Sequence, residues 1–318
     1  MTSGPPPARR LQSGPPGRRA MLEWLKVWVH QEVPPAPLWH FTGGAGLRSI
    51  LASEQLWATD TTSLDDPLEL RYGRRIFCDV LRNTTWRCQP ETLAVLHGLA
   101  DEETLARYVD GLALRVFVVS LCAVGDDAAM WREYTDMARG GEGFAIGFAP
   151  RDAHAWAQLN GPEPNSLFLR SVIYDPTVQA RACRELVEGL IPILESAHDQ
   201  GGLATGAASD FAHALTEGLL ELSAWCKDPV FSGEQEWRLV YQRWDGQSSV
   251  PVDRRHGTRG ELEFVRLWLP NGVGSRFDRL PVTVVRCGPG CDLAGASEAV
   301  AMAGDWRHVA IVSSDLDG

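Results

Sequence analysis

The sequence lacks the patterns that would place it in several common classes. No apolar run approaches the roughly 20 residues that a membrane-spanning helix requires. The first residues include arginines but no apolar stretch of the kind a secretory signal needs. Basic residues number 30 against 41 acidic ones, and the net charge of -11 disfavours a broad surface for duplex nucleic acid. We therefore expect a cytoplasmic protein without a membrane partner. A local basic groove is compatible with this composition.

The common phosphate-binding and hydrolase motifs are also missing. The sequence contains no Walker loop, no G-x-S-x-G elbow and no dinucleotide fingerprint. The stretch "GGEGFAIGF" has suitable glycines but leads into a predicted strand rather than a helix. Seven cysteines are scattered along the chain, and Cys287 with Cys291 has no second pair to complete a zinc site. We expect reduced thiols and no bound metal.

What the sequence contains is the composition of an ordinary globular protein, 44% hydrophobic and 22% charged over 318 residues. Residues 1–20 are expected to form a disordered leader, and Met21 is a candidate true start because an amphipathic helix is predicted from it. Residues 21–318 are predicted to form a single catalytic-type domain with a helical insertion at about 176–227. Strands and helices do not alternate regularly, which indicates the α+β class with a mixed or antiparallel central sheet and flanking helices.

Periodicity and residue type predict the individual elements. Strands are expected at 37–41, 55–59, 114–122, 143–149, 167–174, 236–244, 261–269, 280–288 and 308–314. Helices are expected at 21–31, 44–53, 126–138, 176–199, 206–227 and 292–303. Another helix is expected to begin at Asp66 and Pro67, since proline favours the first helical position, and two more precede residue 110.

The first candidate site is the stretch "LWHFTGGAGL", in which His40 and Thr42 share one face of the predicted strand. The glycines after Thr42 would let backbone N–H groups approach a ligand closely. The start of the following helix favours negative charge, so it is expected to accept phosphates. A histidine with a purely structural role, hydrogen-bonded within the fold, would also fit this pattern.

Two further segments supply aromatic rings and carboxylates. In "MWREY", Met130 and Tyr134 share a helix face, and Trp131 adjoins it, so the segment is either a core helix or a wall for a flat ligand. In "GEQEWRLVY", Glu234 and Glu236 lie two residues apart where a strand is expected to begin, so both should point to one face. Burying two like charges together is costly unless a group such as Arg238 neutralises one of them. Exposed glutamates are the alternative.

The stretch "LDDPLEL" holds a third set of carboxylates, Asp65, Asp66 and Glu69. Carboxylates near a helix start often do nothing more than cap it. A divalent metal would also use such oxygens, although neither paired histidines nor a dense carboxylate loop supports one here.

In order along the chain, "LWHFT", "SLDDPLE", "MWREY", "EQEWRLVY" and "VAIVSSDL" resemble the bacterial family called domain of unknown function 2971, from about Leu38 to Leu316. The same order more distantly resembles ADP-ribosyltransferases of the His-Tyr-Glu class. That resemblance implies a sheet of the ADP-ribosyltransferase type and NAD as a substrate rather than a retained cofactor.

The second resemblance also implies roles for individual residues. His40, with Thr42, would hold the NAD ribose, and Tyr134 or Trp131 would stack on nicotinamide. Glu236 would stabilise the cationic ribose or activate the acceptor, with Glu234 orienting that acceptor and Arg238 lining the same site. The acceptor of ADP-ribose, protein or nucleic acid, stays undetermined.

Two other functions compete with this one. A nucleotide-binding sensor or effector of a bacterial defence or stress system would use the same cleft without chemistry, and would bind nucleotide tightly without releasing nicotinamide. A metal-dependent phosphodiesterase would be built on Asp65, Asp66, Glu69 and the late glutamates, and would bind metal there.

Overall fold

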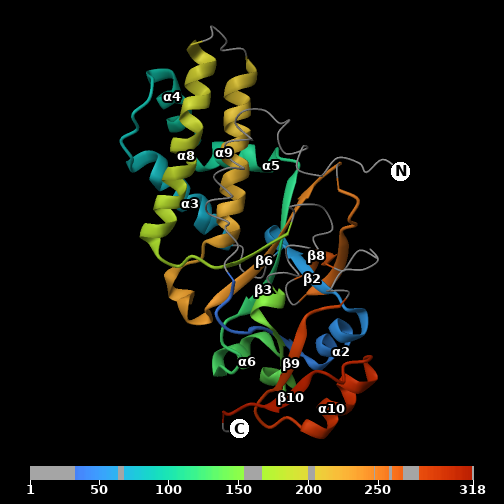
Figure 1. The fold of residues 1–318 in the computed structure, drawn as a ribbon. Coiled ribbons are helices and arrows are strands. Elements are labelled where there is room, and N and C mark those ends of the chain that lie inside the picture. The colour runs from blue at the N-terminus through green and yellow to red at the C-terminus, as the bar shows by residue number, and fades with distance from the viewer. Residues whose placement is uncertain are drawn as a thin grey trace, which may run out of the picture.

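The structure, a computed structural model, describes residues 33–63, 68–153, 167–199, 205–246, 248–257, 260–267 and 279–316. These ranges form a mixed α+β fold with one open sheet of ten strands and flanking helices (Figure 1). The α+β class predicted from the sequence is therefore confirmed. The expected leader at 1–20, Met21 and the helix at 21–31 lie outside the described residues.

The elements follow one another in an order close to the predicted one. The strands are β1 (Leu38–Gly43), β2 (Leu56–Asp60), β3 (Leu114–Cys122), β4 (Gly143–Phe148), β5 (Leu167–Ser171), β6 (Glu236–Trp244), β7 (Asp253–Gly257), β8 (Gly260–Leu267), β9 (Val282–Cys287) and β10 (Ala310–Ser313). The helices are α2 (Gly44–Ser53), α3 (Leu68–Asn83), α4 (Pro90–Leu99), α5 (Glu102–Asp110), α6 (Ala128–Tyr134), α8 (Pro176–Asp199), α9 (Thr205–Trp225) and α10 (Leu293–Met302).

Three differences from the predicted elements matter for the site. Strand β7 was not expected, because "DRRHG" is polar throughout and ends in glycine. Helix α6 ends at Tyr134 instead of continuing to residue 138, because Thr135 is extended and a separate 3-10 turn follows at Met137–Arg139. A second 3-10 turn, at Pro229–Glu234, precedes β6.

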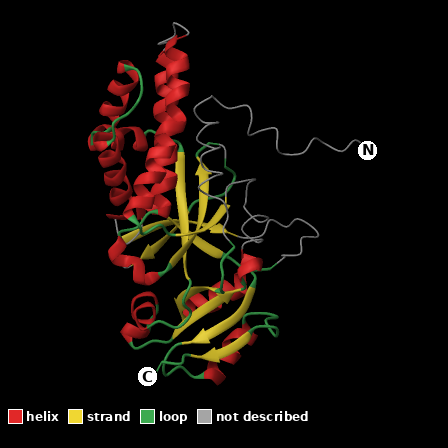
Figure 2. Ribbon diagram, turned by 60° about the vertical axis from the view of Figure 1, so that its left-hand side comes forward, coloured by secondary structure: helices red, strands yellow, loops and turns green. Residues whose placement is uncertain are grey.

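The sheet runs in the order β10-β9-β4-β1-β3-β2-β8-β7, with β6 on β3 and β5 on β6. Its only parallel pair within the described residues is β9 with β10, and the other pairs are antiparallel. Strands nearer β10 and strands nearer β7 separate into two groups in space (Figure 2).

The split arises at β3, which has three partners. Strand β6 pairs along the whole of β3, from Leu114 to Cys122. A strand has only two edges, so β1 and β2 share the other one. Strand β1 meets it at Cys122, and β2 meets it at Phe117 and Val118. The two strands diverge between these contacts, which leaves a fork opposite residues 119–121, and α2 links the two arms of that fork.

Apolar side chains pack on both faces of this sheet. Helices α3, α4, α5, α8 and α9 form a layer whose core includes Val116, Val118 and Val240 from β3 and β6. On the opposite face, Phe117, Val119 and Leu121 of β3 share a second core with residues of α2 and α10. Among the helices in the described ranges, none has the length and apolarity needed to cross a bilayer.

Candidate functional site

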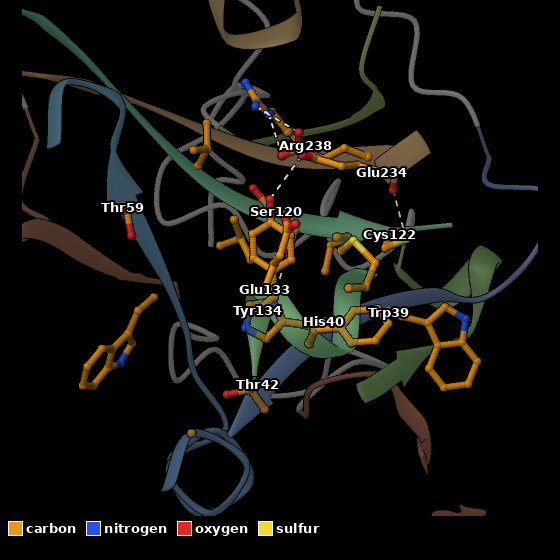
Figure 3. Close-up of a pocket in the computed structure, with 18 of the residues that line it drawn as sticks. Trp39, His40, Thr42, Thr59, Ser120, Cys122, Glu133, Tyr134, Glu234 and Arg238 are labelled. Atoms are coloured by element: carbon orange, nitrogen blue, oxygen red, sulfur yellow. Dashed lines mark hydrogen bonds and ion pairs between the residues drawn. The ribbon is translucent and has the colours of Figure 1, made fainter. Parts of the chain in front are cut away.

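The fork opens into a cleft of about 490 Å³, a volume typical of small-ligand sites (Figure 3). One wall comes from β1 and α2, and another from β2 with the β7–β8 hairpin. Residues 118–122 of β3 form its floor, and α6, the turn at Pro229–Glu234 and β6 close the remaining side. The cleft thus draws side chains from segments distributed over most of the described chain.

Most of the residues predicted from the sequence meet in this cleft. The lining includes His40, Thr42, Met130, Tyr134, Glu234, Glu236 and Arg238. The predicted convergence of His40, Tyr134 and Glu236 is therefore confirmed as geometry. Trp131 does not join them, because its ring is buried against Phe41 and its indole N–H donates to Asp126 Oδ1 at 2.7 Å.

His40 occupies the arm of the fork formed by β1. Its Nδ1 lies 3.1 Å from the carbonyl oxygen of Ser120, in the part of β3 that neither β1 nor β2 covers. A carbonyl only accepts, so Nδ1 carries the proton and donates. Burial lowers the pKa of His40. The hydrogen bond to Ser120 opposes this change, and the positive charge of Arg255 adds to it as the smallest of the three causes. The ring is consequently neutral near pH 7, and Nε2 is a hydrogen-bond acceptor.

The start of α2 does not serve the purpose expected from its glycines. A side chain at Gly43 would collide with the carboxylate of Asp136, and one at Gly46 would collide with the Thr42 hydroxyl. Of the glycines at this turn, Gly46 lines the cleft, whereas Gly43 and Gly44 do not. At Gly43 and Gly46, side chains of the protein itself therefore approach the backbone closely. A carboxylate already lies against Gly43, which disfavours a phosphate at this helix start on steric and electrostatic grounds.

Glu236 is held in a buried ionic cluster. Arg238 donates to both of its oxygens, from Nε at 2.9 Å and Nη2 at 3.0 Å, and Lys227 Nζ lies 3.1 Å from Oε2. Burial raises the pKa of Glu236, but Arg238, Lys227 and a hydrogen bond from Ser120 outweigh it and bring the pKa to about 2. The predicted neutralisation of one glutamate by Arg238 is confirmed.

Glu234 reaches the same place by a different route from the one predicted. It ends the 3-10 turn rather than beginning the strand, and Gln235 between the glutamates has a left-handed backbone with φ 44°. Strand alternation therefore does not explain why the two carboxylates converge. Their common partner does, because Lys227 Nζ also lies 2.5 Å from Glu234 Oε2. The Tyr134 hydroxyl donates to the other oxygen of Glu234 at 3.3 Å.

Tyr134 stands at the rim of the cleft, with 43% of its surface exposed. Desolvation of the hydroxyl, and next the negative charge of Glu234, raise its pKa, so the phenol stays protonated and donates. Asp127 caps the start of helix α6, where its side chain accepts from the backbone N–H groups of Ala129 and Met130. This cap aligns the first turn so that Met130 and Tyr134 face the cleft together.

Sequence reasoning missed several charged or polar lining residues, among them Lys227, Ser120 and Arg255. Lys227 lies two residues after the end of α9, so the segment predicted to be a helical insertion ends at the site. The C-terminal turn of α9 also takes part, because Arg238 Nη1 donates to the carbonyl of Ala224 at 3.0 Å. Nothing in the stretch "WCKDPV" marks Lys227 as a site residue, because its burial is visible only in the fold.

The side chains of the third candidate set lie outside the part of the chain that the structure describes. Asp65 and Asp66 lie outside the described residues, and Glu69 belongs to the first turn of α3. Within the ranges that the structure covers, no group of three or more His, Cys, Asp or Glu side chains could hold a metal ion.

Comparison with known proteins gives one match. No curated protein and no solved structure matches the chain. Residues 130–239 match the model of a family described as protein of unknown function (DUF2971). The likeness was expected from Leu38 to Leu316, but the matched segment starts at α6 and leaves His40 outside. That segment contains Tyr134, both glutamates and Arg238, so the part of the chain that carries this side of the cleft is similar to the DUF2971 family.

Proposed function

We propose that the protein cleaves NAD at the bond between nicotinamide and ribose and transfers ADP-ribose to an acceptor, as an ADP-ribosyltransferase-like enzyme. The observation that carries this proposal is the cleft itself. It joins a histidine, a tyrosine and a glutamate pair in the order expected of the His-Tyr-Glu class. Its floor is β3, the strand at which the sheet forks. Its volume of about 490 Å³ suits a nucleotide-sized ligand.

The tautomer of His40 supports a role in binding ribose. With Nδ1 donating to Ser120, Nε2 is left to accept a hydrogen bond. A ribose hydroxyl donates such a bond, whereas a phosphate oxygen does not. The exposed ring of Tyr134 at the rim offers a flat surface for nicotinamide.

The two glutamates differ in what they can do for the departing nicotinamide. Breaking the C–N bond builds positive charge on the ribose, which a nearby carboxylate stabilises. Glu236 is 5% exposed and both of its oxygens are bound by cations. The side chain of Glu234 is 16% exposed and adjoins Tyr134. We therefore assign Glu234 to the ribose and acceptor, and Glu236 to positioning Lys227 and Arg238. This reverses the ranking suggested by the sequence motif alone.

The proposal is tested by following nicotinamide release from NAD by chromatography. The wild-type protein should release nicotinamide. Glu234→Gln should lower kcat on the order of a hundredfold, the size expected for a lost electrostatic contact in the transition state. His40→Ala should chiefly raise KM. Glu133→Gln is the matched control, because it lines the same cleft from α6. No release of nicotinamide by a folded wild-type protein that binds NAD would refute the enzymatic proposal.

One observation favours a second candidate, a nucleotide-binding sensor without chemistry. Glu234 and Glu236 are matched by Lys227 and Arg238, so the acidic side of the cleft is electrostatically balanced. A balanced cluster suits ground-state binding better than stabilisation of a cation. Tight NAD binding with unchanged NAD after prolonged incubation would select this candidate.

A further inference from the structure

The cleft has two ends of different electrostatic character. At one end Glu234, Glu236, Lys227 and Arg238 bind one another. At the other end stand Trp57 and Thr59 of β2 and Arg255 of β7. His40 lies within electrostatic reach of Arg255, whose charge contributes to lowering the pKa of the imidazole.

Arg255 is oriented by aromatic rings and by a hydroxyl. Trp57 and Phe264 stack with centroids 4.4 Å apart. The guanidinium carbon of Arg255 lies 5.6 Å from the Trp57 centroid and 5.7 Å from that of Phe264, so it stands beside this stack. Its Nη2 donates to Thr59 Oγ1 at 3.3 Å. A guanidinium supported in this way presents a planar fork that matches the oxygens of a phosphate.

Neighbouring arginines have different surroundings. Arg254 pairs with Glu261 and Glu263, Arg266 pairs with Asp253, and Arg115 pairs with Asp60. Arg255 lines the cleft, and these three do not. Since side chains alternate along a strand, Arg254 and Arg255 point to opposite faces of β7. One strand thus provides both a candidate ligand contact and its natural control.

We infer that Arg255, together with Thr59, binds a phosphate group of the ligand, so that the cleft recognises a ribose phosphate compound rather than a nucleoside. This inference rests on the proposed function for the identity of the ribose. Two contacts define the ligand class: His40 accepts a bond from a sugar hydroxyl, and Arg255 donates to phosphate oxygens at the adjoining wall. The phosphate that was expected at the start of α2 thereby lies at the β2–β7 side, away from the carboxylate of Asp136.

The experiment compares two probes by calorimetry, ADP-ribose and nicotinamide riboside, of which only the first carries phosphate. Arg255→Ala should weaken ADP-ribose binding by roughly ten- to a hundredfold, as expected for losing a charge-assisted hydrogen bond. Its affinity for nicotinamide riboside should stay within about twofold of the wild type. The ADP-ribose affinity of Arg255→Lys should lie between those of the wild type and Arg255→Ala, because lysine keeps the charge but not the planar fork of donors. Arg254→Ala should bind both probes like the wild type.

Failure of this inference differs from failure of the proposed function. If Arg255→Ala binds ADP-ribose as tightly as the wild type, the inference is wrong, even when the protein releases nicotinamide from NAD. If ADP-ribose binding depends on Arg255 but no nicotinamide is released, the inference stands and the enzymatic proposal fails. If the folded wild-type protein binds neither probe, both are overturned. Melting curves of each variant establish that it is folded.

Discussion

Replacing Glu236 by glutamine tests whether the ionic cluster supports the fold as well as the cleft. The sequence motif alone predicts that the fold survives this change, because a carboxylate in a pocket rarely adds stability. The structure predicts otherwise. Glu236 is 5% exposed and Arg238 is 2% exposed, and the glutamine would take the Glu236 carboxylate away from this buried guanidinium.

The size of the effect follows from the cluster. Breaking a buried ion pair by removing one member costs about 3–5 kcal/mol. Lowering the pKa of Glu236 from 4.5 to about 2 corresponds to about 3 kcal/mol, which agrees. At about 2–4 °C per kcal/mol, Glu236→Gln should melt roughly 6–12 °C below the wild type. Glu234→Gln should lower the melting temperature less, because Glu234 is more exposed and Lys227 still has Glu236 as an ion-pair partner.

The pH dependence gives an independent check with a fixed sign. A carboxylate whose pKa is lower in the folded state contributes its full stability above the unfolded value of 4.5. That contribution is lost as the pH falls from 4.5 through about 2. Urea unfolding over this range should show a gap between wild type and Glu236→Gln that closes toward low pH. Equal stability of the two proteins at pH 7 would refute the buried-cluster reasoning.

Three further predictions concern other sites. Burial, with the charge of Glu217 as a second cause, raises the pKa of Glu221 to about 8, so stability should fall as pH rises from 4.5 to 8, and urea unfolding of Glu221→Gln should lack this fall. Since the pKa of His40 is lowered, calorimetric ADP-ribose affinity should hold from pH 8 to 6.5 and decline only below, whereas a flat profile through pH 4 would contradict the role of neutral His40. Gly125→Ala should lower the melting temperature by several degrees, because the new methyl collides with the rigid Trp39 ring, while Gly98→Ala has open space.

The local sequence pattern was sufficient to predict elements that depend on neighbouring residues alone. The span 114–122 is β-branched and apolar throughout, and β3 has those bounds. The helix at 44–53 was also predicted at its observed bounds, since its apolar face and the glycines before it act within a few residues. His40 and Thr42 share a face because they lie two apart on one strand, and both line the cleft.

Other features depend on partners far away in the chain. The backbone of Gln235 adopts its left-handed conformation beside a lysine that precedes the turn, so the convergence of the glutamates could not be read from their spacing. Gly43, which precedes α2, accommodates Asp136, which follows α6. Arg255 was missed because its strand is polar and is defined by pairing with β8 instead of by an apolar pattern.

The fork in the sheet also has a mechanical consequence. Strand β3 is the only member of the described sheet that joins the arm containing β1, β4, β9 and β10 to the arm containing β2, β8 and β7. A ligand held by His40 on one arm and Arg255 on the other would act as a cross-brace between them. Its binding should slow amide hydrogen exchange in β1 and β2 at the same time, and the added rigidity should reach β10 and β7, the outer strands that the ligand never touches.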